Sequence, residues 1–472
     1  MSTGPQGVDG GAPTSLYAAH QKVYPREVKG RYASLRNLAV WALLGIYYVL
    51  PWLTWNDRQA VLFDLPARKF YIFGLTFWPQ DFFFMAWLLI IAALTLFFVT
   101  AIAGRLWCGY ACPQTVWTEA FLWMERVTEG KHNQRRKLDR GPWTREKVLR
   151  KSAKQFLWIG FALWTGFTFV AYFTPVTELG QKLLTFSAGP WETFWVLFYG
   201  FATYGNAGLL REQVCKYMCP YARFQSAMFD KDTMIISYDE RRGEPRGGRK
   251  RSIDHRAAGL GDCIDCNMCV QVCPTGIDIR DGLQIECIAC AACVDVCNEV
   301  MDKMEYPRGL IRYSTHHAME EQQPVRVLRP RVMVYGALLL TLLIGFGTAV
   351  ANRSTLIVDI IRDRNTLYRE LPGGMIENVY TVTFVNKTEV ERRYDIAAHG
   401  IEGLELSVDV AMPLVSGPGE VRRIPLRLNA PAEAIPPGGA EVTLVVEARG
   451  AAPTTIERDT RFIGPTPGGT PR

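Results

Sequence analysis

Eight of the twelve cysteines lie between Cys263 and Cys297, in two runs that share the spacing C-x2-C-x2-C-x3-C. When this spacing occurs twice, three cysteines of one run and the last cysteine of the other can hold each of two [4Fe-4S] clusters. The two-residue spacers aim three thiolates at three irons, and the fourth thiolate comes from a distant segment. We therefore predict two clusters and one-electron transfer. The predicted ligand sets are Cys263, Cys266, Cys269 and Cys297 for one cluster, and Cys287, Cys290, Cys293 and Cys273 for the other.

Structural zinc and disulfide bonds are the alternative uses of these thiols, and both suit the spacing less well. Zinc sites usually take four ligands in two C-x2-C pairs, not two runs of four. The second run ends in Cys297-Asn298 where the first ends in Cys273-Pro274. This difference weakens a turn but removes no ligand.

The other four cysteines form two copies of the pattern C-x3-C-P, at Cys108 to Pro113 and at Cys215 to Pro220. The spacing of i to i+4 predicts two thiols on one helical face, and the proline predicts that the second cysteine lies near a helix start. A helix N-terminus and nearby cations are expected to lower the pKa of these thiols. The nearby cations are Arg105, Arg211 and Lys216.

Thiolates are soft ligands that suit Cu(I) or an iron–sulfur cluster. We predict a copper or redox site in which the repeat, offset by 107 residues, brings four thiols to one place on the cytoplasmic face. Met218 is a possible further soft ligand, although packing is its more ordinary role. The alternative is that these cysteines are small buried hydrophobic side chains. The four predicted catalytic and copper-binding residues are Cys108, Cys112, Cys215 and Cys219.

The composition indicates a chain with both membrane and soluble parts. Of its 472 residues 49% are hydrophobic and 21% are charged, and the net charge is +7. The basic run at 241–251 contains Gly and Pro but no aromatic residue for base stacking, which favours a linker over a nucleic-acid site. We therefore expect membrane lipid, and no nucleic acid, as a partner.

Five apolar runs are close to the ~20 residues that cross a bilayer. Residues 104–154 carry twelve Lys or Arg, whereas residues 175–190 carry only Lys182. Basic loops stay in the cytoplasm, so we expect the N-terminus and the clusters inside and the C-terminal domain in the periplasm. The five runs are 35–55, 82–103, 155–174, 191–210 and 332–351.

The C-terminal quarter changes to short alternating runs separated by turn residues. Runs such as 377–386, 392–398, 404–410, 422–428 and 440–448 predict an antiparallel, immunoglobulin-like β-sandwich. The chain is thus expected to be multidomain, with an α-helical membrane part of five transmembrane helices, an inserted 2[4Fe-4S] ferredoxin-like domain and the sandwich. The expected divisions are a disordered, basic N-terminal segment (1–34), a membrane domain with four transmembrane helices and both C-x3-C-P elements (35–230), a cytoplasmic ferredoxin-type domain with linkers (231–330), a fifth transmembrane helix (331–351) and the periplasmic sandwich (352–472).

This combination resembles the FixG-like cytochrome c oxidase accessory proteins, also called CcoG. The resemblance rests on CGYACP, CKYMCP, the cysteines from Cys263 to Cys297, the five spans and the sandwich. It implies a cupric reductase of the bacterial cytoplasmic (inner) membrane that reduces Cu(II) to Cu(I) during assembly of cbb3-type cytochrome c oxidase. The implied partners are oxidase subunits or copper chaperones, reached through the membrane or the sandwich.

Two other hypotheses keep the same residues. The membrane half also looks like the quinol-oxidising subunits of periplasmic nitrate reductase systems, so the chain could pass electrons between quinol and a soluble redox partner. Alternatively, it could be a non-enzymatic copper-binding assembly scaffold. In the reductase hypothesis, a cytoplasmic donor or the quinone pool supplies the electrons.

Overall fold

The computed structural model describes residues 22–363, 367–388, 390–449 and 454–465. The chain forms two compact units, one of Met1–Asp64 with Leu88–Leu342 and one of Leu65–Trp87 with Leu343–Arg472. The expected disordered tail at 1–21 lies outside the described residues.

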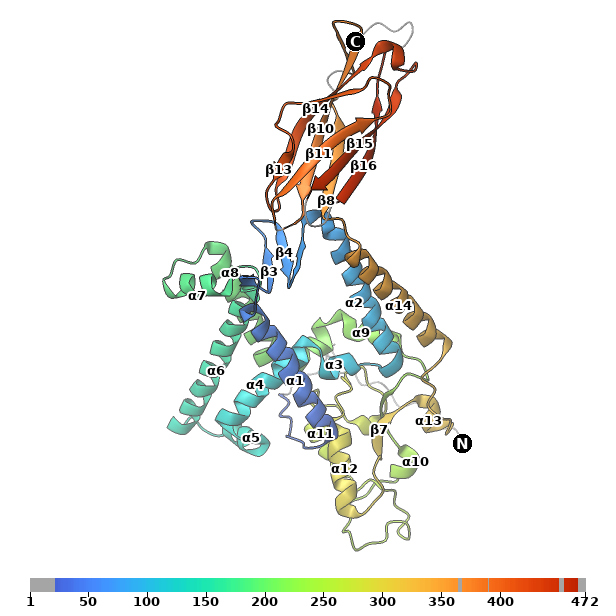
Figure 1. Ribbon diagram of the computed structural model, residues 1–472. Coiled ribbons are helices and arrows are strands. Elements are labelled where there is room, and N and C mark those ends of the chain that lie inside the picture. Colours follow the sequence, from blue (N-terminus) through green and yellow to red (C-terminus); the bar gives the residue numbers. More distant parts are fainter. Residues whose placement is uncertain (1–21, 364–366, 389, 450–453, 466–472) are drawn as a thin grey trace, which may run out of the picture. The chain divides into compact units, whose positions relative to one another are not determined.

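Three helices in the described residues are long and apolar enough to cross a membrane. These helices are α1 (Arg31–Val49), α2 (Phe82–Ala103) and α14 (Pro330–Ala351), and all three are labelled in Figure 1. These are the first, second and fifth of the predicted spans. Most of their side chains are not buried by protein, as expected where lipid covers the helix.

The helix at the third predicted span is long but less apolar, and the helix at the fourth is short, so five transmembrane helices are not confirmed. Helix α6 (Arg145–Val170) has a basic first half, and α8 (Pro190–Thr203) has only 14 residues before the backbone continues as the π-helix η3 (Tyr204–Leu210). The two helices pack closely. A Cβ atom at Gly166 would lie 2.2 Å from the carbonyl oxygen of Val196, so only glycine fits there.

The other elements of the larger unit are short. Two of them, β6 and β7, pair antiparallel and bracket the cysteine-rich stretch. The elements are η1 (Leu50–Trp52), β1 (Thr54–Trp55), β2 (Arg58–Gln59), β3 (Val61–Asp64), α3 (Leu106–Tyr110), α4 (Pro113–Glu129), α5 (His132–Arg140), α7 (Val176–Leu184), the π-helix η4 (Val214–Met218), α9 (Pro220–Ala227), β6 (Ile235–Tyr238), α10 (Glu240–Gly243), α11 (Met268–Val272), η5 (Ile279–Asp281), α12 (Ala292–Met304), β7 (Ile311–Ser314) and α13 (His316–Glu320).

Buried charges on α4 tie the helices of this unit together. Glu125 is fully buried and accepts from Arg135 at 3.1 Å and from Arg211 at 3.0 Å. Burial alone would raise the pKa of Glu125, but the guanidinium groups of Arg211 and Arg135 outweigh burial and hold that pKa below its ordinary value. One turn later, Glu129 pairs with Lys154 of α6 at 2.9 Å. The ion pairs therefore fix α4 against α5, α6 and the residue that follows η3.

The segment before α1 packs against the cysteine-rich part, which differs from the disorder expected for 1–34. Asp295 of α12 accepts from the backbone N–H groups of Tyr32 and Ala33, the latter at 2.7 Å. A carboxylate in this position caps the N-terminus of α1. The Arg26 N–H also donates to the carbonyl of Gln271 at 2.9 Å. Residues 22–34 are therefore held by the region that carries the cysteines.

The smaller unit contains the predicted antiparallel sandwich, seen as two layers of strands in Figure 1. One sheet has the order β12-β14-β10-β8 with β9 beside β10, and the other has the order β13-β11-β15-β16. Alternate residues of each strand are buried between the sheets, among them Tyr380, Phe384 and Tyr394. The strands are β8 (Leu356–Arg362), β9 (Arg369–Leu371), β10 (Met375–Asn386), β11 (Arg392–His399), β12 (Glu405–Val408), β13 (Leu414–Ser416), β14 (Val421–Pro431), β15 (Ala440–Arg449) and β16 (Thr454–Phe462), with η6 (Ala432–Ala434) between β14 and β15.

A hairpin far earlier in the chain completes the smaller unit, and the sequence did not predict it. Strands β4 (Lys69–Ile72) and β5 (Leu75–Phe77) pair antiparallel and lead into η2 (Pro79–Asp81). Asp81 accepts from Lys387 at 2.7 Å, and both residues are buried. This ion pair joins the hairpin to the end of β10.

The parity of the crossings gives a first prediction. Three crossings and five crossings are both odd, so either number puts the two ends of the chain on opposite sides. Alkaline phosphatase can be fused to the chain as a reporter of sidedness, because it is active only in the periplasm, where its disulfides form. Fusions after Gly464 are expected to be active and fusions after Glu321 inactive. A fusion after Ser187, between α7 and α8, is expected to be active if α6 and α8 cross. Inactivity at Ser187 would reduce the number of crossings to three.

The buried Asp81–Lys387 pair gives a second prediction. Asp81→Asn leaves the Lys387 ammonium buried without its counter-charge, which should destabilise the smaller unit by roughly 3–5 kcal/mol. Arg427→Gln is the control, because it removes an exposed pair with Asp409 and should cost about 0–1 kcal/mol. Amide hydrogen exchange in β10 of the full chain measures both. Equal exchange in the two variants would contradict a stabilising role for the buried pair.

Candidate metal and electron-transfer centre

The two cysteine runs have the same backbone path. In each run the residues on either side of the second cysteine have positive φ: Asp265 and Asn267 flank Cys266, and Ala289 and Ala291 flank Cys290. The left-handed conformation is unusual for alanine, so the surrounding fold imposes it. Each left-handed pair turns the chain before a helix, α11 or α12, and brings the three nearby thiols to one side of the loop.

The structure gathers the eight cysteines around two separate cavities. Cys263, Cys266, Cys269 and Cys297 line the first. Cys273, Cys287, Cys290 and Cys293 line the second, where Cys269 also reaches the wall. The division follows the two ligand sets that the spacing predicts, with the fourth thiol of each set contributed by the other run. The rest of both walls is mainly apolar.

The geometry fits a polynuclear group better than a single ion. Across the described ranges, no three His, Cys, Asp or Glu side chains converge tightly enough to hold one metal ion. A zinc site needs four ligands within about 2.3 Å of a single centre. A [4Fe-4S] cube instead takes one thiolate at each of four separated irons, so the residues around each cavity fit a cube.

Arginines of the basic run hold the first of these loops, which the sequence did not predict. Arg249 donates to the carbonyl of Gly261 at 2.6 Å and to that of Cys263 at 3.2 Å. Arg242 pairs with Asp262. The basic run is therefore part of the fold of the cysteine-rich region as well as a linker to it.

Arg280 is a second unpredicted support. Its side chain is almost fully buried and contacts Asp278, Asp265 and Asn267. Hydrogen bonds from Arg280 hold the pKa of Asp278 below its ordinary value. The fork of the guanidinium thereby fixes both left-handed residues of the first loop.

The two C-x3-C-P elements do not stack their thiols on one helical face, which corrects the expectation from i, i+4 spacing. Cys108 lies in α3, but the helix ends at Tyr110, and Cys112 has an extended ψ of 129° as the N-cap of α4. Cys215 lies in η4, and Cys219 is also extended before α9. The proline that follows each second cysteine starts a new helix, as predicted, and so breaks the continuous helix.

The four thiols nevertheless lie close together. Burial raises the pKa of Cys215 to about 12, and the neighbouring thiols of Cys112, Cys108 and Cys219 contribute to the same shift. Burial also raises the pKa of Cys108 and of Cys112, against the opposing charge of Arg105. The expectation of lowered thiol pKa values was therefore wrong for Cys108, Cys112 and Cys215, because desolvation outweighs the helix N-terminus and the cations.

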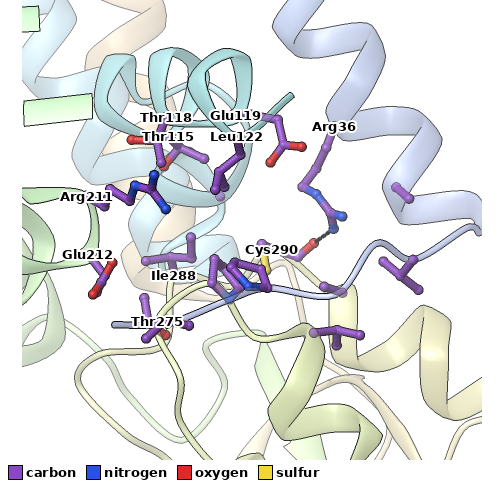
Figure 2. A pocket seen from close by; sticks show the side chains of 18 of the residues that line it. Arg36, Thr115, Thr118, Glu119, Leu122, Arg211, Glu212, Thr275, Ile288 and Cys290 are labelled. Carbon is purple, nitrogen blue, oxygen red and sulfur yellow. Dashed lines mark hydrogen bonds between the residues drawn. The ribbon is translucent and has the colours of Figure 1, made fainter. Parts of the chain in front are cut away.

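A cavity of about 140 Å³ lies beside both cysteine sets. Cys215 and Cys290 are both in its wall, with Thr115, Thr118 and Glu119 of α4. Figure 2 shows Arg36 of α1 extending across the cavity towards the Cys290 carbonyl, to which it donates. The structure thus places a cysteine of a C-x3-C-P element and a cysteine of the predicted cluster ligands around the same cavity.

Family models match three regions of the chain. A 4Fe-4S dicluster domain matches residues 210–316, a 4Fe-4S binding domain matches residues 85–130, and an IG-like fold at the C-terminal of FixG matches residues 346–465. The two iron–sulfur models contain all twelve cysteines between them.

Relatives match over most of the chain. It is 38% identical to the nitrogen fixation protein FixG of Rhizobium meliloti, over 83% of this chain and 82% of the relative. The proteins RdxB and RdxA of Cereibacter sphaeroides are 43% and 40% identical, over 84% and 90% of this chain and 86% and 92% of their own.

The chain belongs to the FixG family. This FixG-family chain is an iron–sulfur redox protein with an IG-like C-terminal domain and with apolar helices suited to a membrane. The predicted family resemblance is confirmed.

The two cavities give a third prediction. Cys297→Ala and Cys273→Ala should each remove one of two [4Fe-4S] clusters, so that iron falls from about eight to about four atoms per chain. Because the two variants affect different cavities, the electron paramagnetic resonance (EPR) signals that they lose should be different and complementary. Loss of the same signal in both variants would contradict the division of ligands.

Proposed function

We propose that this protein is a cupric reductase that gives single electrons to Cu(II) at the thiols of Cys108, Cys112, Cys215 and Cys219. One observation supports the proposal: two cysteine pairs that lie 107 residues apart in sequence are near enough to influence one another electrostatically, and Cys215 of the second pair lines the same cavity as Cys290. Two [4Fe-4S] clusters, when bound by the eight cysteines assigned above, would supply one-electron transfer.

Copper enters the proposal as the substrate. Thiolates are soft ligands and favour Cu(I) over harder cations, so the site stabilises the product of reduction more than the Cu(II) substrate. No three of the described ligating side chains converge on one point, and Cu(I) accepts coordination by two thiolates. Binding of copper by thiolates would release the protons of the thiols that bind it.

A second candidate for the same thiols has its own support. The 4Fe-4S binding domain model covers residues 85–130, where Cys108 and Cys112 are the only cysteines. Four thiols from two helix junctions could then hold a further iron–sulfur cluster in place of copper. Iron content separates the two candidates, because only this one predicts that removing Cys108 lowers it.

The family and the apolar helices support a proposal for the cellular setting. We propose that the chain lies in the bacterial cytoplasmic membrane with the cysteine sets in the cytoplasm and the sandwich in the periplasm. There it would supply Cu(I) for the assembly of cbb3-type cytochrome c oxidase, with oxidase subunits or a copper chaperone as its partner. The cysteines support the redox role.

The fourth prediction tests the copper site. Cys108→Ser and Cys219→Ser should abolish Cu(II) reduction by the dithionite-reduced, detergent-solubilised protein while leaving its iron content unchanged. Ala111→Ser is the matched control, since it adds a hydroxyl inside the same motif without removing a thiol, and should reduce Cu(II) at the wild-type rate. Absorbance of a Cu(I) chelator measures the product.

Two outcomes would contradict the copper assignment. Wild-type reduction by both cysteine variants would exclude the four thiols as the site. A loss of about four irons from Cys108→Ser would assign these thiols to a cluster.

A further inference from the structure

The two C-x3-C-P copies differ at the residue after their first cysteine. The first copy has Gly109, whereas the second has Lys216 at the equivalent place. Gly109 is buried against the loop of the second cavity. A Cβ atom there would lie 2.7 Å from the Ile288 carbonyl oxygen and 2.9 Å from the Cα atom of Cys290. Side chains do not approach backbone atoms so closely, so only glycine permits this contact.

The next residue of the first copy makes a second contact with the same loop. The hydroxyl group of Tyr110 lies next to that of Tyr313, and Tyr313 donates to the carbonyl of Ala289 at 2.5 Å. Ala289 and Cys290 both line the second cavity. In the second copy the equivalent tyrosine is Tyr217, which is 47% exposed. The repeat is therefore symmetric in sequence spacing but asymmetric in burial, since Tyr110 is half-buried and Tyr217 is exposed.

Two arginines hold the loop in the same place. Arg105, immediately before α3, donates to the carbonyl of Ile285, and Arg36 of α1 donates to that of Cys290. Ile288 and Cys290 also line the cavity, and Figure 2 shows Cys290 beside Arg36. Hydrogen bonds from charged donors are stronger than neutral ones, so the loop is fixed on both sides of the Gly109 contact.

We propose that the two copies have different roles, with electrons entering the thiol site through the Cys108–Cys112 copy, and that Tyr110 is a positioning residue that holds the Cys290 loop against it. This inference rests on the proposed function. The step is the transfer of one electron. Cu(II) gains it and becomes Cu(I), the one-electron donor bound among Cys273, Cys287, Cys290 and Cys293 loses it, and no covalent bond within the protein changes.

The contact explains why the first copy is the entry point. Cys108 is covalently joined to Gly109, whose backbone touches that of Cys290. An electron that moves from Cys290 to Cys108 along this path therefore crosses once between the two backbones, at about van der Waals distance. A lysine in place of glycine, as in the second copy, would separate these backbones. Cys215 of the second copy instead lines the cavity beside Cys290.

Tyr110→Phe and Tyr217→Phe form the matched pair that tests the inference in the full, cluster-loaded chain. Tyr110→Phe removes one hydroxyl and keeps the ring. It should raise amide exchange in residues 287–291 about fivefold, the effect of losing one hydrogen bond, and should alter the EPR spectrum of one of the two clusters. It should also slow oxidation of the dithionite-reduced protein by Cu(II) in stopped flow. Tyr217→Phe should leave all three measurements at wild-type values.

Gly109→Ala and Lys216→Ala are a second pair with a larger expected effect. The added methyl group at Gly109 must displace the loop, so Cu(II) should oxidise this variant more slowly than Tyr110→Phe, at unchanged iron content and copper stoichiometry. Lys216→Ala should leave the amide exchange of residues 287–291 at the wild-type value. If Gly109→Ala loses iron, Tyr110→Phe still decides the question.

The outcomes separate this inference from the function on which it rests. Equal oxidation rates and equal exchange in Tyr110→Phe and Tyr217→Phe would overturn the unequal roles while leaving copper reduction intact. A slower rate in Tyr217→Phe alone would reverse the assignment of the two copies. Wild-type protein whose reduced clusters Cu(II) does not oxidise would overturn the proposed function, and the inference with it.

Discussion

The close backbone contact between Gly109 and the Cys290 loop is the constraint on which the larger unit depends. It requires a residue without a side chain in α3, a cysteine loop held in a left-handed conformation and two arginines that occupy the loop carbonyls. It also requires α1 to begin where Asp295 can cap it. The short helices and loops around the cysteines therefore form one body with the ends of α1 and α2.

Charge burial provides the second support of this arrangement. A carboxylate such as Glu125 is costly to bury unless cations compensate it, and here Arg135 and Arg211 approach it from different segments. Arg211 directly precedes the segment that carries Cys215. The ion pairs that fix α4 therefore also fix the distance between the two C-x3-C-P copies, since α4 begins at Pro113.

Much of the fold and of the cysteine chemistry could be predicted from the sequence. The eight-cysteine spacing predicted the two ligand sets that the cavities divide, because a short spacer limits which thiols can reach one group. Five of the strands followed from alternating residues with one buried face. Strand β16 (Thr454–Phe462) was missed because its buried face is interrupted by polar residues, and the β4–β5 hairpin was missed because its partner lies some 300 residues later in the chain.

The sequence by itself determined which residue types are available: soft thiolates in two sets, apolar helices and alternating strands. These depend on local spacing, which the covalent chain imposes. Only the tertiary structure decided that α8 ends after 14 residues in a π-helix, that the thiols of each pair do not share one helical face, and that burial raises the pKa of Cys108, Cys112 and Cys215. It also decided which C-x3-C-P copy touches the Cys290 loop. That contact joins Gly109 to Cys290, about 180 residues later in the chain, and depends on how the segments around both residues pack.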